Sequence, residues 1–182
     1  MEDEHYADCD GLCYDCDHFS YCDLSPDTKS ESLPIFEKPQ KKIYLASSLS
    51  HECRPDMYRV LSELRSSGHQ VYAPVEHTIP GAWDYSNQAW GRLVFEEDIK
   101  AIRQSDIVVA ISYGRTKTTA GSSWEIGFAY GIGKKVIVVE MDEGPQSLMV
   151  SNGSHATVKG LEGLLEYDFS KMKRTMTESE QK

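Results

Sequence analysis

The sequence has no long hydrophobic run. Its longest apolar segments, Ile107–Ile111 and Val136–Val139, fall far short of the roughly 18 residues that a membrane-spanning helix needs. The first residues, Met1-Glu2-Asp3-Glu4, are acidic and no apolar stretch follows them, unlike a secretory signal peptide. We therefore expect a cytoplasmic protein that does not bind a membrane.

Clusters of basic residues are also missing. Of the net charge of −10, almost all lies in residues 1–40, which contain 11 Asp or Glu and only two Lys or Arg. Residues 41–182 contain 18 acidic and 17 basic residues and are nearly neutral. Because binding to nucleic acid needs clustered Lys and Arg at the phosphates, we expect no nucleic-acid partner. A small nucleoside or nucleotide ligand remains compatible with this charge balance.

Cysteine is scarce in residues 41–182, where Cys53 stands alone and is expected to be a small, buried side chain. The other four lie close together in the acidic leader: Cys9, Cys13, Cys16 and Cys22. Several thiolates in a short loop can hold one tetrahedral ion, so we expect a structural zinc there, with an iron–sulfur cluster as the second choice. The alternatives are a reduced, unfolded tail or disulfides, which are unusual in the cytosol.

Hydrophobic periodicity divides the rest of the chain into alternating strands and helices. Strands are expected at 42–48, 70–73, 106–111 and 135–140, and helices at 55–67, 88–104, 122–132 and 158–167. This order predicts an α/β fold: a doubly wound, flavodoxin- or Rossmann-like parallel sheet with helices on both faces. We expect a Cys-rich leader and linker at 1–40, the α/β domain at 41–170 and a polar tail at 171–182.

Ligands of such sheets bind at the carboxyl ends of the strands, where the turns at 46–49, 74–77 and 112–122 are expected to meet. The third turn leads into a helix that carries Glu125 in its expected first turn. Either Glu125 faces the cleft, or Ser122-x-x-Glu125 is a capping box. A second carboxylate, Asp98, lies on the preceding helix, and two carboxylates beside one cleft are what cleavage of a glycosidic bond requires. Trp83 or Tyr85 is a candidate for stacking on a base.

Three segments together resemble the nucleoside 2-deoxyribosyltransferase family. They are Lys42-Ile43-Tyr44-Leu45-Ala46, Phe95-Glu96-Glu97-Asp98-Ile99 with Ser105-Asp106 after it, and Ala120-Gly121-Ser122-Ser123-Trp124-Glu125-Ile126-Gly127-Phe128-Ala129-Tyr130. The resemblance runs from about residue 41 to 150 and leaves out the leader.

The resemblance implies an enzyme that exchanges the base of 2′-deoxyribonucleosides with a free nucleobase and needs no cofactor for catalysis. Glu125 would be the nucleophile that forms a covalent deoxyribosyl intermediate, Asp98 would handle the proton of the base, and Tyr44 would position Glu125. It also implies a homo-oligomer in which a neighbouring subunit completes the pocket. The expected substrate-binding residues are Ser47, Ser48, Trp83, Thr119, Gly121, Ser122, Ser147 and Met149.

The sequence departs from the family pattern at three places. Thr119 stands six residues before Glu125, where the family commonly has Asp, and Ser47-Ser48 replaces Gly-Pro. Ser147-Leu148-Met149 is the stretch that matches the loop from the neighbouring subunit, which in the family often has Asn and Met. Hydroxyls at Ser47, Thr119 and Ser147 are closer to the related 2′-deoxynucleoside 5′-monophosphate N-glycosidases, which transfer the sugar to water. Against that alternative, no Arg follows the first strand as a phosphate anchor. A second alternative is a nucleotide-binding sensor without catalytic activity.

Overall fold

A computed structural model describes residues 40–114 and 119–175. Five parallel strands form one sheet in the order β2-β1-β3-β4-β5. The strands are β1 (Lys42–Ala46), β2 (Gln70–Tyr72), β3 (Ile107–Ser112), β4 (Lys135–Glu140) and β5 (Ala156–Lys159). The helices are α1 (Arg54–Ser66), α2 (Asn87–Gln104), α4 (Ala120–Gly131), α5 (Leu148–Gly153) and α6 (Gly160–Glu166), and the short 3₁₀ turns are η1 (Pro74–Glu76) and η2 (Ala82–Asp84).

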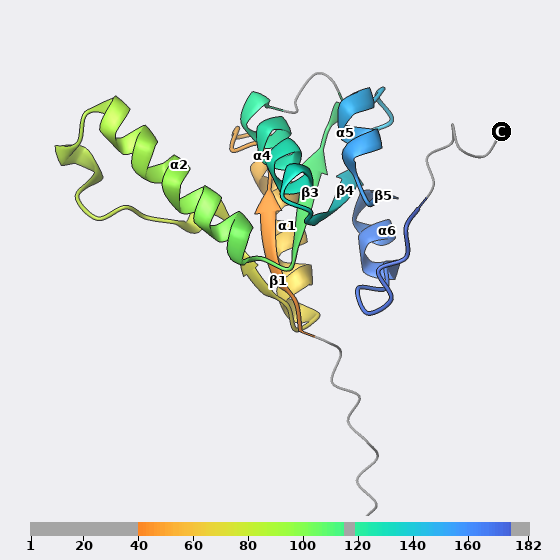
Figure 1. Ribbon diagram of the computed structural model, residues 1–182. Coiled ribbons are helices and arrows are strands. Elements are labelled where there is room, and N and C mark those ends of the chain that lie inside the picture. Colours follow the sequence, from red (N-terminus) through yellow and green to blue (C-terminus); the bar gives the residue numbers. More distant parts are fainter. Residues whose placement is uncertain (1–39, 115–118, 176–182) are drawn as a thin grey trace, which may run out of the picture. The chain divides into compact units, whose positions relative to one another are not determined.

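Helices cover both faces of the sheet, which confirms the predicted doubly wound α/β fold (Figure 1). Alternate residues of each strand point to opposite faces, so Leu45 packs in one apolar cluster with α1 and α6, and Ala46 packs in another with α2, α4 and α5. The six residues of β3 are all buried, as the continuous apolar run predicted for a strand covered on both sides.

The carboxyl-terminal third differs from the prediction. A single helix was expected over 158–167, but residues 156–159 form the edge strand β5, and the helix begins only at Gly160. Gly160 has φ +60, a conformation that glycine adopts without strain, and it lets the chain turn sharply from strand to helix. The short helix α5 was not expected at all. Periodicity missed β5 because only Ala156 and Val158 of its four residues are buried.

The segment after α6 returns to the sheet. Met172 is buried in the same cluster as α1 and α6, and the Thr175 hydroxyl accepts a hydrogen bond from the Thr157 backbone amide at 2.7 Å. The polar tail predicted from residue 171 therefore contributes to the core through Met172. In the described part of the chain, no helix combines the length and apolarity needed to cross a membrane.

One helix is packed much less than the others. α2 has 18 residues, and Ile102 near its carboxyl end is its one buried residue. Its amino-terminal turns extend away from the sheet (Figure 1). From residue 74 to residue 100 no side chain is buried; we call these residues, which include η1, η2 and most of α2, the arm.

Candidate active site

The amino-terminal end of α4 fixes the direction in which Glu125 points. Thr119 is the N-cap, and its side-chain oxygen accepts a hydrogen bond from the Ser122 backbone amide at 3.2 Å. Ser122 is buried inside the helix, so the capping box predicted for Ser122 and Glu125 does not form. Glu125 falls in the second helical turn instead of the expected first, which leaves its carboxylate available for another partner.

That partner is Tyr44. The Tyr44 hydroxyl donates a hydrogen bond of 2.8 Å to Oε1 of Glu125. Tyr44 lies in the middle of β1 and is fully buried, packed with Ile126 and Ala129 of α4 in one apolar cluster. Since a buried ring has little freedom to move, the core of the domain positions this hydroxyl, and the hydroxyl in turn positions Glu125.

Burial changes the acidity of both groups. It raises the pKa of Glu125 to about 7, against the opposing effect of the Tyr44 hydrogen bond and with a further contribution from the charge of Asp98. Burial, with the nearby charges of Glu125 and Asp98, holds the pKa of Tyr44 well above its ordinary value. Tyr44 is therefore always protonated and acts as a donor, whereas Glu125 changes its charge near neutral pH.

A second tyrosine connects the sheet with Asp98. Tyr72 pairs with Tyr44 in the register of β1 and β2, and the two rings stack with centroids 5.6 Å apart. The Tyr72 hydroxyl lies 3.4 Å from Oδ1 of Asp98, a long contact for a hydrogen bond. Partial burial raises the pKa of Asp98, and the contacts with Tyr72, the nearby His77 and Tyr44 oppose that shift. Two carboxylates thus lie beside two stacked tyrosines.

Comparison with known proteins gives the family of the chain. The family model described as Nucleoside 2-deoxyribosyltransferase matches residues 43–176, which include both carboxylates and both tyrosines. The chain belongs to the nucleoside 2-deoxyribosyltransferase family. Members of this family are enzymes that act on the N-glycosidic bonds of nucleosides. A search of curated proteins finds no match.

Among solved structures, a 2-deoxyribosyltransferase from the psychrotolerant bacterium Bacillus psychrosaccharolyticus is 29% identical, with a TM-score of 0.68 over 74% of this chain and 98% of that one. A CMP N-glycosidase from Clostridium botulinum is 17% identical, with a TM-score of 0.49 over 68% and 95%. A 2-deoxyribosyltransferase from Leishmania mexicana is 18% identical, with a TM-score of 0.42 over 72% and 80%. The last two structures are too dissimilar to this chain to say anything about its activity.

The hydroxyl groups that were predicted to bind substrate already make hydrogen bonds within this chain. The Ser47 hydroxyl donates to the Ser48 carbonyl at 3.3 Å, and the Ser48 hydroxyl donates to Oγ of Ser50 at 3.2 Å. The hydroxyls of Thr119 and Ser122 lie 3.0 Å from each other. Gly121, in the first turn of α4, is exposed. These groups therefore shape the turns beside Glu125, and a ligand would have to compete with the hydrogen bonds that they make.

The remaining predicted ligands lie on exposed segments. Trp83 in η2 is 99% exposed, and η2 precedes the end of α2 that extends away from the sheet (Figure 1), so the structure does not bring Trp83 to the carboxylates. Ser147 is the N-cap of α5, and Met149 in the first turn of α5 is 83% exposed. Trp124 lies beside Glu125 in sequence but packs between Phe95 and Phe128, with centroids 5.2 and 5.3 Å away.

Sequence reasoning missed Tyr72. Its signal would have been the pairing of two tyrosines at matching positions of adjacent strands, but strand register is not readable from one sequence. The cysteines predicted to bind zinc lie outside the described residues. Within the ranges 40–114 and 119–175, no three His, Cys, Asp or Glu side chains are grouped so that they could hold a metal ion. Cys53 is buried, as predicted.

Proposed function

We propose that the protein is a nucleoside 2-deoxyribosyltransferase, with Glu125 as its nucleophile. The observation that carries this proposal is the 2.8 Å hydrogen bond from the buried Tyr44 hydroxyl to Oε1 of Glu125, with Asp98 close enough to affect the pKa of both. The 29% identical relative from Bacillus psychrosaccharolyticus is itself a 2-deoxyribosyltransferase, which supports the same assignment.

The reaction follows from the two carboxylates. Tyr44 occupies Oε1, so Oε2 of ionised Glu125 attacks C1′ of the deoxyribose and forms a glycosyl ester. The bond from C1′ to the base breaks, the base nitrogen keeps the electron pair, and Asp98 supplies its proton. An incoming base then gives its N–H proton to Asp98 and attacks C1′, and Glu125 leaves. Two inversions at C1′ give net retention of configuration.

The raised pKa values suit these roles. With a pKa of about 7, Glu125 is a stronger nucleophile than an ordinary carboxylate and still ionises near neutral pH. Burial raises the pKa of Asp98 as well, which favours its protonated form when the base leaves. A sensor without catalytic activity would need neither an aligned nucleophile nor a second acid beside it.

The hydrolase alternative receives less support from the geometry. It requires hydroxyls for a 5′-phosphate, yet two of the three that favoured it, Ser47 and Thr119, make hydrogen bonds within the chain. Arg54 is committed as well, because its Nε donates to the Leu49 carbonyl at 3.1 Å. A phosphate bound beside Glu125 would have to displace these contacts.

A pair of assays tests the proposal. Deoxyinosine or thymidine with free adenine is expected to yield deoxyadenosine, detected by chromatography. dGMP without an acceptor is expected to be stable. Release of free guanine and deoxyribose 5-phosphate from dGMP, with no transfer to adenine, would show the hydrolase instead. Binding of nucleosides without turnover in either assay, unchanged by Glu125→Ala, would show the sensor.

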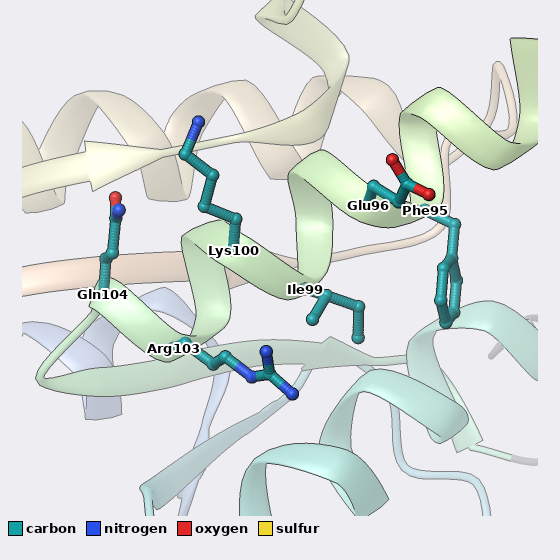
Figure 2. Close-up of a pocket in the computed structure, with 6 residues that line it drawn as sticks. All are labelled: Phe95, Glu96, Ile99, Lys100, Arg103 and Gln104. Carbon is teal, nitrogen blue, oxygen red and sulfur yellow. The ribbon is translucent and has the colours of Figure 1, made fainter.

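We also propose that a second copy of the chain covers the exposed groove along α2, on the side where Phe95 packs on Trp124 of α4. A shallow groove of about 360 Å³ runs along this helix, lined by Phe95, Glu96, Ile99, Lys100, Arg103 and Gln104. In Figure 2, Phe95, Ile99 and Arg103 point to one side of the helix, and Lys100 and Gln104 point to the other. An amphipathic helix normally buries its apolar side, but here one residue of α2 is buried.

The charges on this face favour a second copy as the partner. Glu96 and Lys100 both line the groove and lie one helical turn apart on α2, so a two-fold rotation that packs α2 antiparallel on its copy brings Glu96 of one copy to Lys100 of the next. The Glu96 side chain pairs with Arg92 at 2.9 Å, but both are exposed, and such a pair is worth little.

Sedimentation of charge variants tests this interface. Glu96→Lys or Lys100→Glu alone is expected to weaken self-association about 10-fold or more, and the double variant Glu96→Lys/Lys100→Glu is expected to restore it. A matched control is Glu162→Lys, because Glu162 is exposed on α6 at the opposite face of the sheet. A monomeric wild type, or single variants that associate like the wild type, would rule this face out.

A further inference from the structure

Two tyrosines on adjacent strands face the two carboxylates of the site. Tyr44 and Tyr72 are paired in the register of β1 and β2 and their rings stack with an interplanar angle of 16°. The Tyr44 hydroxyl points to Glu125 on α4, and the Tyr72 hydroxyl points to Asp98 on α2. The stacked pair therefore links the two acids of the site through the sheet.

The two acids differ in what else holds them. Glu125 precedes Ile126 and is close to Ala129, both buried against the sheet. Asp98 belongs to the arm, in which no side chain from 74 to 100 is buried. Helix packing alone therefore fixes Asp98 loosely, and the contact with Tyr72 is a direct link between its carboxylate and the sheet.

From this arrangement we propose that Tyr72 is a positioning residue that holds the Asp98 carboxyl group beside Glu125 during proton exchange with the base. The inference rests on the function proposed above and adds a residue to it. The Tyr72 hydroxyl contacts Asp98, and the Tyr72 ring stacks on the ring of Tyr44. The 3.4 Å separation of Tyr72 Oη from Asp98 Oδ1 is expected to shorten when substrate is bound, because such contacts are often long in a free enzyme.

The charges around Asp98 make the role of Tyr72 measurable. Burial, followed by the charge of Asp98, keeps the pKa of Tyr72 above its ordinary value, so its hydroxyl donates. The groups that face Asp98 are Tyr72, His77 and Tyr44, which stabilise its charged form, Glu97, which opposes it, and Glu125 across the site. Removing the Tyr72 hydroxyl takes away one stabilising contact, so the pKa of Asp98 should rise further.

Tyr72→Phe is the decisive variant because it removes the hydroxyl and keeps the ring that stacks on Tyr44. We expect kcat for base exchange to fall roughly 10-fold, with a smaller change in KM. The pH profile of kcat should shift upward on the limb set by Asp98. Tyr58→Phe is the matched control, since Tyr58 is a half-exposed tyrosine on α1 at the other face of the sheet.

A double-mutant cycle separates positioning from packing. If Tyr72 acts through Asp98, Tyr72→Phe should cause no further loss of rate in an Asp98→Asn background. If Tyr72 only packs, Tyr72→Phe should behave like the wild type and Tyr72→Leu should unfold or inactivate the protein. Additive losses, or an unchanged Tyr72→Phe enzyme, would overturn the proposal.

A measurement that needs no turnover keeps this inference separate from the proposed function. The pKa of the Asp98 carboxyl is followed by carbon-13 NMR in the wild type and in Tyr72→Phe, with Asp98→Asn to assign the signal. A higher pKa of Asp98 in Tyr72→Phe is expected even if the enzyme proves to be a hydrolase. An identical pKa in both proteins would overturn the contact with Tyr72 and leave the proposed transferase activity intact.

Discussion

The two halves of the candidate site belong to regions of very different packing. Tyr44 and the β-strand neighbours that support Glu125 are buried, and all six residues of β3 are as well. Asp98 comes from the arm, where residues 74–100 include no buried side chain. The contrast teaches that the single chain's own core builds the nucleophilic half of the site. The proton-handling half depends on contacts made by the arm, with Tyr72 and, as we propose, with a second copy.

The largest effect is expected in the well-packed half, from Glu125→Ala. Removing the nucleophile should lower kcat at least 10³-fold, which corresponds to about 4 kcal/mol of transition-state stabilisation. Single-turnover assays of base exchange measure the loss. The matched control is Glu162→Ala, an exposed glutamate of α6 at the opposite face of the sheet. A covalent sugar adduct trapped on any other residue would contradict this assignment.

The well-packed half was also the half that the sequence predicted best. The apolar run of β3 correctly predicted a strand that is buried on both faces of the sheet. The residue pattern around Glu125 indicated that this carboxylate is a candidate for catalysis. The sequence pattern was misleading for the N-cap of α4. Ser122-x-x-Glu125 fits the pattern of a capping box, but the helix begins earlier and Thr119 is its N-cap. Hydroxyl residues compete for this position, and only the backbone geometry decides between them.

The arm shows where sequence patterns stop being informative. The apolar periodicity of α2 predicts a helix correctly but cannot tell whether its apolar side meets the same chain or another one. The sequence makes Trp83 a candidate for stacking on a base, yet the path of the segment that carries it depends on long-range packing. The contact of Tyr72 with Asp98 joins residues 26 positions apart, and it requires knowing which strands are neighbours.

Truncation of one isoleucine in each region tests whether the two regions differ in packing. Ile137 on β4 is fully buried, so Ile137→Ala should lower the free energy of unfolding by about 3 kcal/mol. Ile99 on the arm lines an open groove, and Ile99→Ala should cost less than about 1 kcal/mol in a monomeric chain. Urea unfolding at low protein concentration compares the two. Equal losses would mean that the arm is packed as firmly as the sheet.

A smaller effect is expected from Tyr44→Phe, which keeps the buried ring and removes the hydrogen bond to Glu125. Orientation of the nucleophile should weaken and kcat should fall roughly 10- to 100-fold, or about 2 kcal/mol. Because this hydrogen bond lowers the pKa of Glu125, its loss should also move the acid limb of the pH profile upward. The deficit should then be larger at pH 6 than at pH 9, and a deficit independent of pH would contradict the role of Tyr44 in charge control.

The last effect concerns the pH dependence of stability. The folded protein holds Glu125 with a pKa of about 7, raised from 4.5, so ionisation of Glu125 opposes folding as the pH rises through this interval. Glu125→Gln removes the charge and keeps an acceptor for Tyr44. The variant should match the wild type near pH 4.5 and exceed its stability by about 3 kcal/mol above pH 8. Urea unfolding at both pH values, with the exposed Glu162→Gln as control, measures this difference. A gain of the same size at both pH values would mean that water solvates the Glu125 carboxylate, and the well-packed half of the site would then be as open as the arm.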